Sequence, residues 1–122
     1  MKVAIIGSRS FTDYERFKGE LKRYRGMITE IISGGALGTD TLASRYATEM
    51  NIPIIEHLPD WDSFGDKAPL ERNKLIVRDA EMMIAFWDGT SRGTQHAINL
   101  FKSKPGTKIY HIIRVESRGG KD

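Results

Sequence analysis

Short apolar segments alternate with amphipathic segments along the sequence, and this alternation constrains the fold more than any other feature. Strand-length segments that contain clustered apolar residues occur at residues 2–6, 28–33, 53–57, 82–87 and 107–113. Between them, apolar side chains recur at helical spacing in residues 13–25, 39–50, 68–79 and 93–102. Strands that alternate with helices pair in parallel, because each crossover returns the chain to the same end of the sheet. We therefore predict an α/β fold, a single doubly wound domain with a five-stranded, mainly parallel sheet.

The domain is predicted to span residues 1–115, with a polar tail at residues 116–122. No repeat, linker or low-complexity segment divides the chain, and 122 residues suit one domain. Residues 58–67 are polar and aromatic and are predicted to form a loop, long enough to suggest a role in function. Trp61 in this loop is a candidate for a lid that stacks on a base.

The net charge of +3 is concentrated in one segment of the chain. Residues 15–25 hold five cations and two anions, and the charges of the rest of the sequence cancel. Phe17, Leu21 and Tyr24 belong to an apolar helical stripe in the same segment, and the cations lie largely on the other side. This pattern favours a solvated helix face over a phosphate-binding patch. Because the aromatic residues belong to the stripe and are not interleaved with the cations, nucleic acid is an unlikely partner.

Several classes of protein are excluded by residue types that are missing or wrongly spaced. The sequence has no cysteine, which excludes disulfides, thiolate metal sites and a cysteine nucleophile, and fits a reducing cytoplasm. His57, His96 and His111 lack the spacing of metal ligands. No apolar run is long enough to span a membrane, and the first residues do not form a signal peptide. We expect a cytoplasmic protein with no metal, no separate cofactor and no membrane contact.

Three of the predicted strands end in glycine-containing loops that lead into a helix. The carboxyl ends of parallel strands meet at one edge of the sheet, where ligands of such folds bind. Free N–H groups and the dipole at a helix N-terminus favour an anion such as phosphate, and glycine lets the backbone approach it closely. The loops contribute the candidate ligand-binding residues Gly7, Ser8, Arg9, Gly34, Gly35, Ala36, Gly38, Thr39, Asp40, Trp87, Asp88, Gly89, Ser91, Arg92, Gly93 and Thr94. Arg72 and Asn73, on the helix at 68–79, are added as partners for a phosphate and for a base or ribose.

These loops do not match the two best-known nucleotide motifs. No loop carries the lysine and hydroxyl pair of a P-loop, and the glycines at 34, 35 and 38 do not have the spacing of the dinucleotide fingerprint. The loops therefore favour a small phosphate-bearing ligand without identifying it.

Four motifs occur in a characteristic order: Gly7-Ser8-Arg9, then Ser33-Gly34-Gly35-Ala36, then Arg72-Asn73, and finally Phe86-Trp87-Asp88-Gly89. The set resembles the YspA-related branch of the SLOG superfamily, relatives of the DNA-processing protein DprA/Smf and of the Lonely Guy phosphoribohydrolases. The resemblance extends over residues 2–113. It implies a Rossmann-like fold, a pocket for nucleotides or nucleotide-derived ligands, and a homo-oligomer. Within the superfamily some members hydrolyse nucleotides, while others only bind or sense them.

The resemblance also bears on catalysis. The phosphoribohydrolases carry two glutamates after the fourth strand, and the matching positions here hold His96 and Ala97. Binding or sensing of an ADP-ribose-type molecule or a nucleoside phosphate is therefore the leading expectation. An N-glycosidic hydrolase is the alternative, and DprA-like binding of single-stranded DNA ranks third. Asp40, Asp88 and His96 are the candidate catalytic residues, although either aspartate could equally bind backbone N–H groups nearby.

Overall fold

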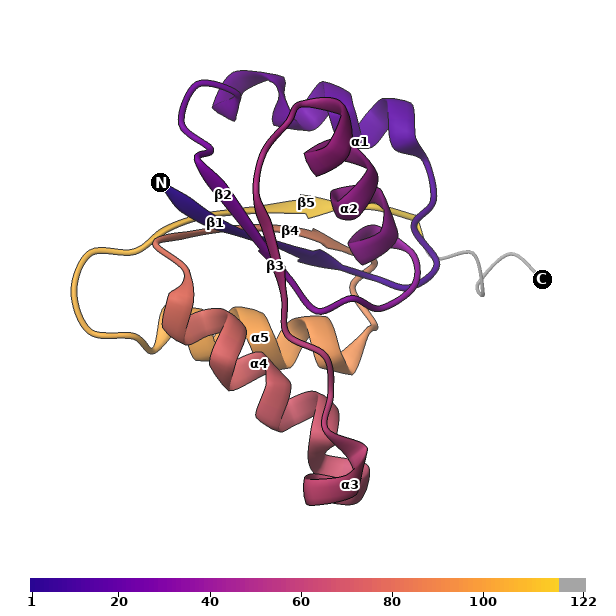
Figure 1. Ribbon diagram of the computed structural model, residues 1–122, viewed down its shortest axis with the longest axis vertical. Coiled ribbons are helices and arrows are strands. Elements are labelled where there is room, and N and C mark those ends of the chain that lie inside the picture. Colours follow the sequence, from indigo (N-terminus) through magenta and orange to yellow (C-terminus); the bar gives the residue numbers. More distant parts are fainter. Residues whose placement is uncertain (117–122) are drawn as a thin grey trace.

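A computed structural model describes residues 1–116, and it has a five-stranded, all-parallel sheet between two layers of helices (Figure 1). The strands run in the order β3-β2-β1-β4-β5. Their bounds are β1 (Lys2–Gly7), β2 (Glu30–Ser33), β3 (Ile54–Glu56), β4 (Met82–Trp87) and β5 (Ile109–Arg114). The doubly wound α/β prediction is confirmed, and every neighbouring pair of strands is parallel. The predicted tail at 116–122 lies outside the described residues, apart from Glu116.

The strand order divides the helices between the two faces of the sheet. The chain leaves β1, passes through α1 (Tyr14–Leu21) and α2 (Thr39–Glu49), and reaches the edge strand β3. It then returns to the other side of β1 through α4 (Ala68–Asp79) and α5 (Arg92–Lys102). Because parallel crossovers are right-handed, this reversal puts α1 and α2 on one face and α4 and α5 on the other (Figure 1). The order reverses between β1 and β4, which is where ligands of such sheets bind.

The two central strands are buried on both faces, which explains why their sequences show no polar alternation. Ile5 faces the layer of α1 and α2, and Ala4 faces the layer of α4 and α5. Phe86 stacks on Phe17, with their ring centroids 4.9 Å apart, and on Phe11 at 5.2 Å. These aromatic contacts join α1 and the loop after β1 to β4, and so hold together the two strand ends at the switch point.

Most predicted elements have the expected positions, with ends that differ by one to four residues. The helix predicted at 13–25 begins after the Asp13 cap, whose carboxylate accepts from the Arg16 backbone N–H at 3.1 Å. It ends as an α-helix at Leu21 and continues as a 3₁₀ turn at Lys22–Tyr24. The helix at 68–79 and the strand at 82–87 have the predicted bounds. None of the helices in the described part is both long and apolar enough to cross a membrane.

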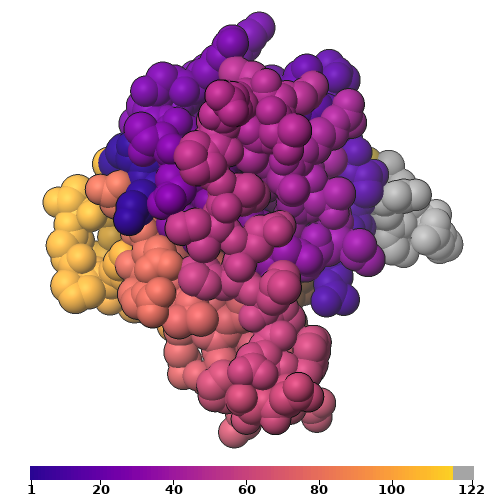
Figure 2. All heavy atoms as spheres, viewed as in Figure 1, coloured from indigo at the N-terminus to yellow at the C-terminus, as the bar shows by residue number. Residues whose placement is uncertain are grey.

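The prediction that residues 58–67 form a loop is wrong. The segment contains the short helix α3 (Trp61–Phe64) and a 3₁₀ turn at Gly65–Lys67. The Asp60 carboxylate starts α3 by accepting from the Ser63 backbone N–H at 3.1 Å. The segment protrudes beyond α4 at the far end of the molecule from α1 and α2 (Figures 1 and 2).

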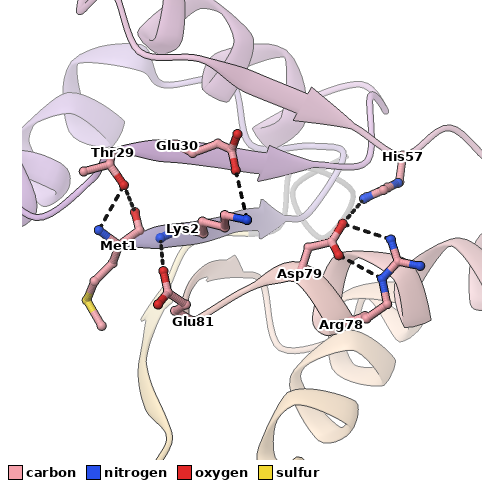
Figure 3. Close-up of polar contacts among 8 residues, drawn as sticks. All are labelled: Met1, Lys2, Thr29, Glu30, His57, Arg78, Asp79 and Glu81. Atoms are coloured by element: carbon pink, nitrogen blue, oxygen red, sulfur yellow. Dashed lines mark hydrogen bonds and ion pairs between the residues drawn. The ribbon is translucent and has the colours of Figure 1, made fainter.

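Polar contacts fix the edge strand β3 and the start of β1 (Figure 3). The Asp79 carboxylate at the end of α4 contacts His57 Nε2 at 2.7 Å, and accepts a second hydrogen bond from Arg78 Nε at 2.8 Å. The hydrogen bond from Arg78, helped by His57, lowers the pKa of Asp79 to about 2 although partial burial opposes this. The Lys2 backbone N–H donates to the Glu81 carboxylate at 2.7 Å. The contact between His57 and Asp79 attaches the segment that follows β3 to the end of α4.

Candidate ligand-binding site

A cavity of about 340 Å³ opens at the carboxyl ends of β1 and β4, at the point where the strand order reverses. Its walls come from the loop after β1, the loop between β2 and α2, one face of α4, and the first turn of α5. The structure brings together these predicted ligand-binding residues as lining: Gly7, Arg9, Ala36, Asp40, Arg72, Asn73, Ser91, Arg92, Gly93 and Thr94.

The remaining predicted residues belong to the same loops and strand ends but do not line the cavity: Ser8, Gly34, Gly35, Gly38, Thr39, Trp87, Asp88 and Gly89. The Thr39 hydroxyl donates to the Ser8 carbonyl at 2.9 Å, which ties the first loop to the start of α2. The Ser8 hydroxyl accepts from the Asp88 backbone N–H at 3.0 Å, which ties the same loop to the end of β4. The indole N–H of Trp87 donates to the Ser91 carbonyl at 3.1 Å, so its polar edge is engaged within the protein. Ser8 therefore joins all three loops through contacts distant in the sequence.

Asp88 organises its own loop. Its Oδ1 accepts from the backbone N–H groups of Thr90 and Ser91, at 2.9 and 2.8 Å. Burial alone would raise the pKa of Asp88, but these hydrogen bonds outweigh it and the pKa is lowered. Asp88 is thus an ionised, hydrogen-bonded carboxylate that does not line the cavity.

Two glycines allow the loops to approach each other closely. Gly38 has a φ of +72°, and a Cβ at this position would overlap the backbone of Arg9. A Cβ at Gly34 would overlap the Arg72 guanidinium, which donates to the Gly34 carbonyl at 2.6 Å. The close approach of backbone to Arg72 therefore requires glycine at position 34.

Burial shifts the pKa values of two oppositely charged side chains in the cavity wall, Arg72 and Asp40. Burial lowers the pKa of Arg72, and the nearby Asp40 opposes this shift. Asp40 is 7% exposed, and burial raises its pKa despite a hydrogen bond from the Ala36 backbone N–H at 3.0 Å and the charge of Arg72. The Ser33 hydroxyl also lowers the pKa of Asp40. The Oδ1 atom of Asp40 has no hydrogen-bond partner in the described part of the chain. The cavity thus has one half-buried cation, Arg72, and one buried acid, Asp40, in its wall.

The first turn of α5 presents unpaired backbone donors at the cavity. The backbone N–H groups of Arg92, Gly93 and Thr94 precede the first intrahelical bond, which Gln95 donates to the Ser91 carbonyl. Ser91 makes no side-chain cap to this helix. The N-terminal end of the helix dipole adds partial positive charge, and the exposed Arg9 and Arg92 add full charges. This wall is suited to an anion such as phosphate.

Asn73 and His96 hold α5 against α4. The buried Asn73 amide donates to the Gly93 carbonyl at 3.1 Å and lies 3.1 Å from His96 Nδ1, while its Oδ1 accepts from Arg72 Nε at 3.2 Å. His96 does not line the cavity. Burial and the charge of Lys74 lower the pKa of His96, so its imidazole is neutral at pH 7. Asn73 therefore aligns Arg72 with the first turn of α5.

The sequence analysis did not identify the apolar part of the cavity, which is formed by Ile6, Pro69, Ile76 and Ala97. Helical spacing contains the signal that would have found part of it. Pro69 and Ile76 lie three residues before and four residues after Arg72, on the same face of α4. Among the described residues, no group of three histidine or acidic side chains could hold a metal ion.

Fold and site together define a Rossmann-like α/β protein with an anion-suited cavity at its switch point. A family model, the YspA, cpYpsA-related SLOG family, matches residues 1–64, and the chain belongs to this family. The match includes the two glycine loops after β1 and β2, but ends before Arg72 and α5.

A relative and a solved structure extend the comparison. The chain is 35% identical over 108 residues to the Gene 61 protein of Mycobacterium phage D29, covering 80% of this chain and 85% of that protein. Its fold is similar to DNA processing protein A (DprA) from Streptococcus pneumoniae, with a TM-score of 0.70 and 18% sequence identity. That similarity covers 89% of this chain and 49% of DprA, so the chain spans about half of that protein and shares its fold.

Proposed function

We propose that this protein binds or senses a nucleotide or nucleotide-derived ligand, either a nucleoside phosphate or an ADP-ribose-type molecule, in the cavity between β1 and β4. One observation carries the proposal. Arg9, Arg72 and Arg92 line a single cavity at the switch point together with the first turn of α5, whose backbone N–H groups have no hydrogen-bond partner within the described residues. The phosphate would contact this wall, and the apolar lining residues Ile6, Pro69, Ile76 and Ala97 would contact the base or sugar.

The chemistry of the lining favours binding over hydrolysis. Cleavage of an N-glycosidic bond needs an acid or base beside the anomeric carbon. Among the described residues, Asp40 is the carboxylate in the lining, and one of its oxygens is occupied by the Ala36 N–H. Asp88 and His96 both lie behind the lining and bond within the protein.

A thermal-shift series with nucleoside monophosphates, ADP-ribose and inorganic phosphate tests the proposal. Ligand at about 100 times its Kd stabilises the folded state by roughly 2.7 kcal/mol, which is readily measured. We expect a rise in Tm with at least one nucleotide, and a smaller rise in a variant with Arg9→Gln and Arg92→Gln. Arg23→Gln is the matched control, since Arg23 is an exposed arginine outside the cavity. No rise with any of these compounds at millimolar concentration would refute the proposal.

Hydrolysis of the bound nucleotide is the second candidate, favoured by the raised pKa of Asp40 inside the cavity. A carboxyl with a raised pKa suits a general acid. The expected result is release of free base from a nucleoside monophosphate, lost in Asp40→Asn while binding is retained. Stoichiometric binding without release of base over hours would eliminate this candidate.

Binding of single-stranded DNA is the third candidate function. The observation behind this candidate is the concentration of cations in residues 15–25, and the affinity for an oligonucleotide should then fall steeply as salt rises. The cysteine-free sequence favours the cytoplasm.

A further inference from the structure

The segment from residue 58 to residue 67, which we call the knob, exposes an unusual group of apolar side chains. Leu58, Trp61 and Phe64 are 65%, 54% and 47% exposed. Figure 2 shows this segment as a protrusion at the end of the molecule away from α1 and α2. Apolar side chains gathered on a protruding segment are typical of a surface that contacts a partner.

The knob is also acidic. It contains Asp60, Asp62, Asp66 and one cation, Lys67. Asp60 caps α3, while Asp62 and Asp66 form no ion pair within the described residues. A partner for the knob must therefore combine apolar surface with positive charge.

A second cavity, of about 610 Å³, has these properties and lies between α1 and α2. We call it the groove. Met50 and the small exposed part of Tyr46, which is 3% exposed, provide its apolar surface, and Lys18, Lys22 and Arg25 provide its cations. Gly19 also lines the groove, and no atom lies within 4 Å of the place where its Cβ would be.

The charges in the groove are not balanced within the chain. Glu15 pairs with Lys18 at 4.0 Å, and Glu49 accepts a hydrogen bond from the Tyr14 hydroxyl. Lys22 and Arg25 have no ion pair within the described residues. Two cations beside an apolar surface are thus available to an acidic, aromatic partner.

We propose that the knob of one copy of this chain inserts into the groove of a second copy. Trp61 and Phe64 would contact Tyr46 and Met50, and the free aspartates would pair with Lys22 and Arg25. The groove is lined by α1, the turn after it and α2. These helices cover one face of the sheet, and the knob protrudes beyond α4 on the other face (Figure 1). The same two surfaces therefore cannot close a symmetric pair, and the contact is head-to-tail. Neither the knob nor the groove contributes a lining residue to the cavity between β1 and β4, so the proposal does not depend on the proposed ligand.

Mixing two variants tests this proposal. One variant, Trp61→Ala with Phe64→Ala, removes the aromatic side chains of the knob. The other, Lys22→Glu with Arg25→Glu, reverses two charges of the groove. In analytical ultracentrifugation, the average molecular mass of the wild type should rise with protein concentration and fall at high salt. Each variant alone should remain monomeric. An equimolar mixture should form dimers of twice the monomer mass and nothing larger, because one intact knob and one intact groove remain. Tyr110→Ala and Arg23→Glu are matched controls outside both surfaces and should associate as the wild type does.

Four results would overturn the proposal: a wild type that stays monomeric at every concentration, association that survives in either variant, a mixture that stays monomeric, or loss of association in the controls. Circular dichroism checks that each variant is folded. If the aromatic variant unfolds, Asp62→Lys with Asp66→Lys tests the knob by charge alone and gives the same expected results. Oligonucleotide binding that the groove variant abolishes, in a wild type that does not self-associate, would assign the groove to nucleic acid instead.

Discussion

Gly93 offers the sharpest separation between stability and ligand binding. It lies in the first turn of α5 and lines the cavity, and no atom lies within 4 Å of the place where its Cβ would be. Replacement of a helical glycine by alanine stabilises a helix by up to about 1 kcal/mol, because alanine loses less backbone entropy on folding. In a chain of this size, that gain corresponds to a rise in Tm of roughly 3 to 5 °C. Gly93→Ala should therefore stabilise the free protein.

The same substitution should weaken ligand binding, since the new methyl group occupies space at the wall of free N–H groups. Gly93→Leu should weaken it further while preserving the helix, since leucine is a good helix former. Gly19→Ala is the matched control, because Gly19 is an exposed helical glycine with open space around it and lies outside this cavity. Calorimetric titration with a nucleoside monophosphate and urea unfolding measure the two effects. Unchanged nucleotide affinity in Gly93→Leu would refute the placement of the ligand beside α5.

Further predictions concern the loops and the attachment of β3. Gly38→Ala should destabilise the fold by more than about 1 kcal/mol in urea unfolding, because a side chain at φ +72° is strained and its Cβ overlaps Arg9; an unchanged urea midpoint would contradict this. Ser8→Ala should lower Tm and also weaken nucleotide binding, because the hydroxyl accepts the Asp88 N–H that positions the third loop; a change in neither would contradict it. The pKa of Asp79 is lowered to about 2 in the folded state. Above the ordinary pKa of about 3.9, its carboxylate therefore stabilises the fold, and this stabilisation is lost as pH falls from about 4 to about 2. Asp79→Asn should therefore be less stable at pH 7 and lose less stability over that window, as urea midpoints across the pH range would show; identical pH profiles would contradict this.

The fold could be predicted from local pattern, and the exceptions have local causes. Helix α4 and strand β4 have the predicted bounds, because Pro69 marks the first turn of the helix and residues 82–87 are apolar throughout. Helix α3 was missed, since its single turn is too short to show periodicity and depends on the Asp60 cap. Strand β3 is shorter than the strand predicted at residues 53–57 and consists of Ile54–Glu56.

The position of the candidate site could be predicted, but not which of its residues line the cavity and which form hydrogen bonds within the protein. Glycine loops after parallel strands indicate the edge of the sheet where a cavity forms, and Arg9, Arg72 and Arg92 meet there. Sequence does not show that Asn73 bonds to Gly93 and His96, because these partners are 20 and 23 residues away. It also left open whether Asp88 faces a ligand or its own loop, and the bonds to Thr90 and Ser91 favour the loop.

The central claim is that a phosphate-bearing nucleotide binds beside the first turn of α5. Backbone amide NMR of the full chain, titrated with a nucleoside monophosphate and separately with inorganic phosphate, tests it most directly. We expect both ligands to shift the amide signals of Gly93 and Thr94, and the nucleotide to shift signals around Ile6 and Ile76 as well. Signals from the groove between α1 and α2 should stay unchanged at low protein concentration. Saturation with nucleotide that leaves the α5 amides unmoved, or shifts confined to Lys18 and Lys22, would contradict the account.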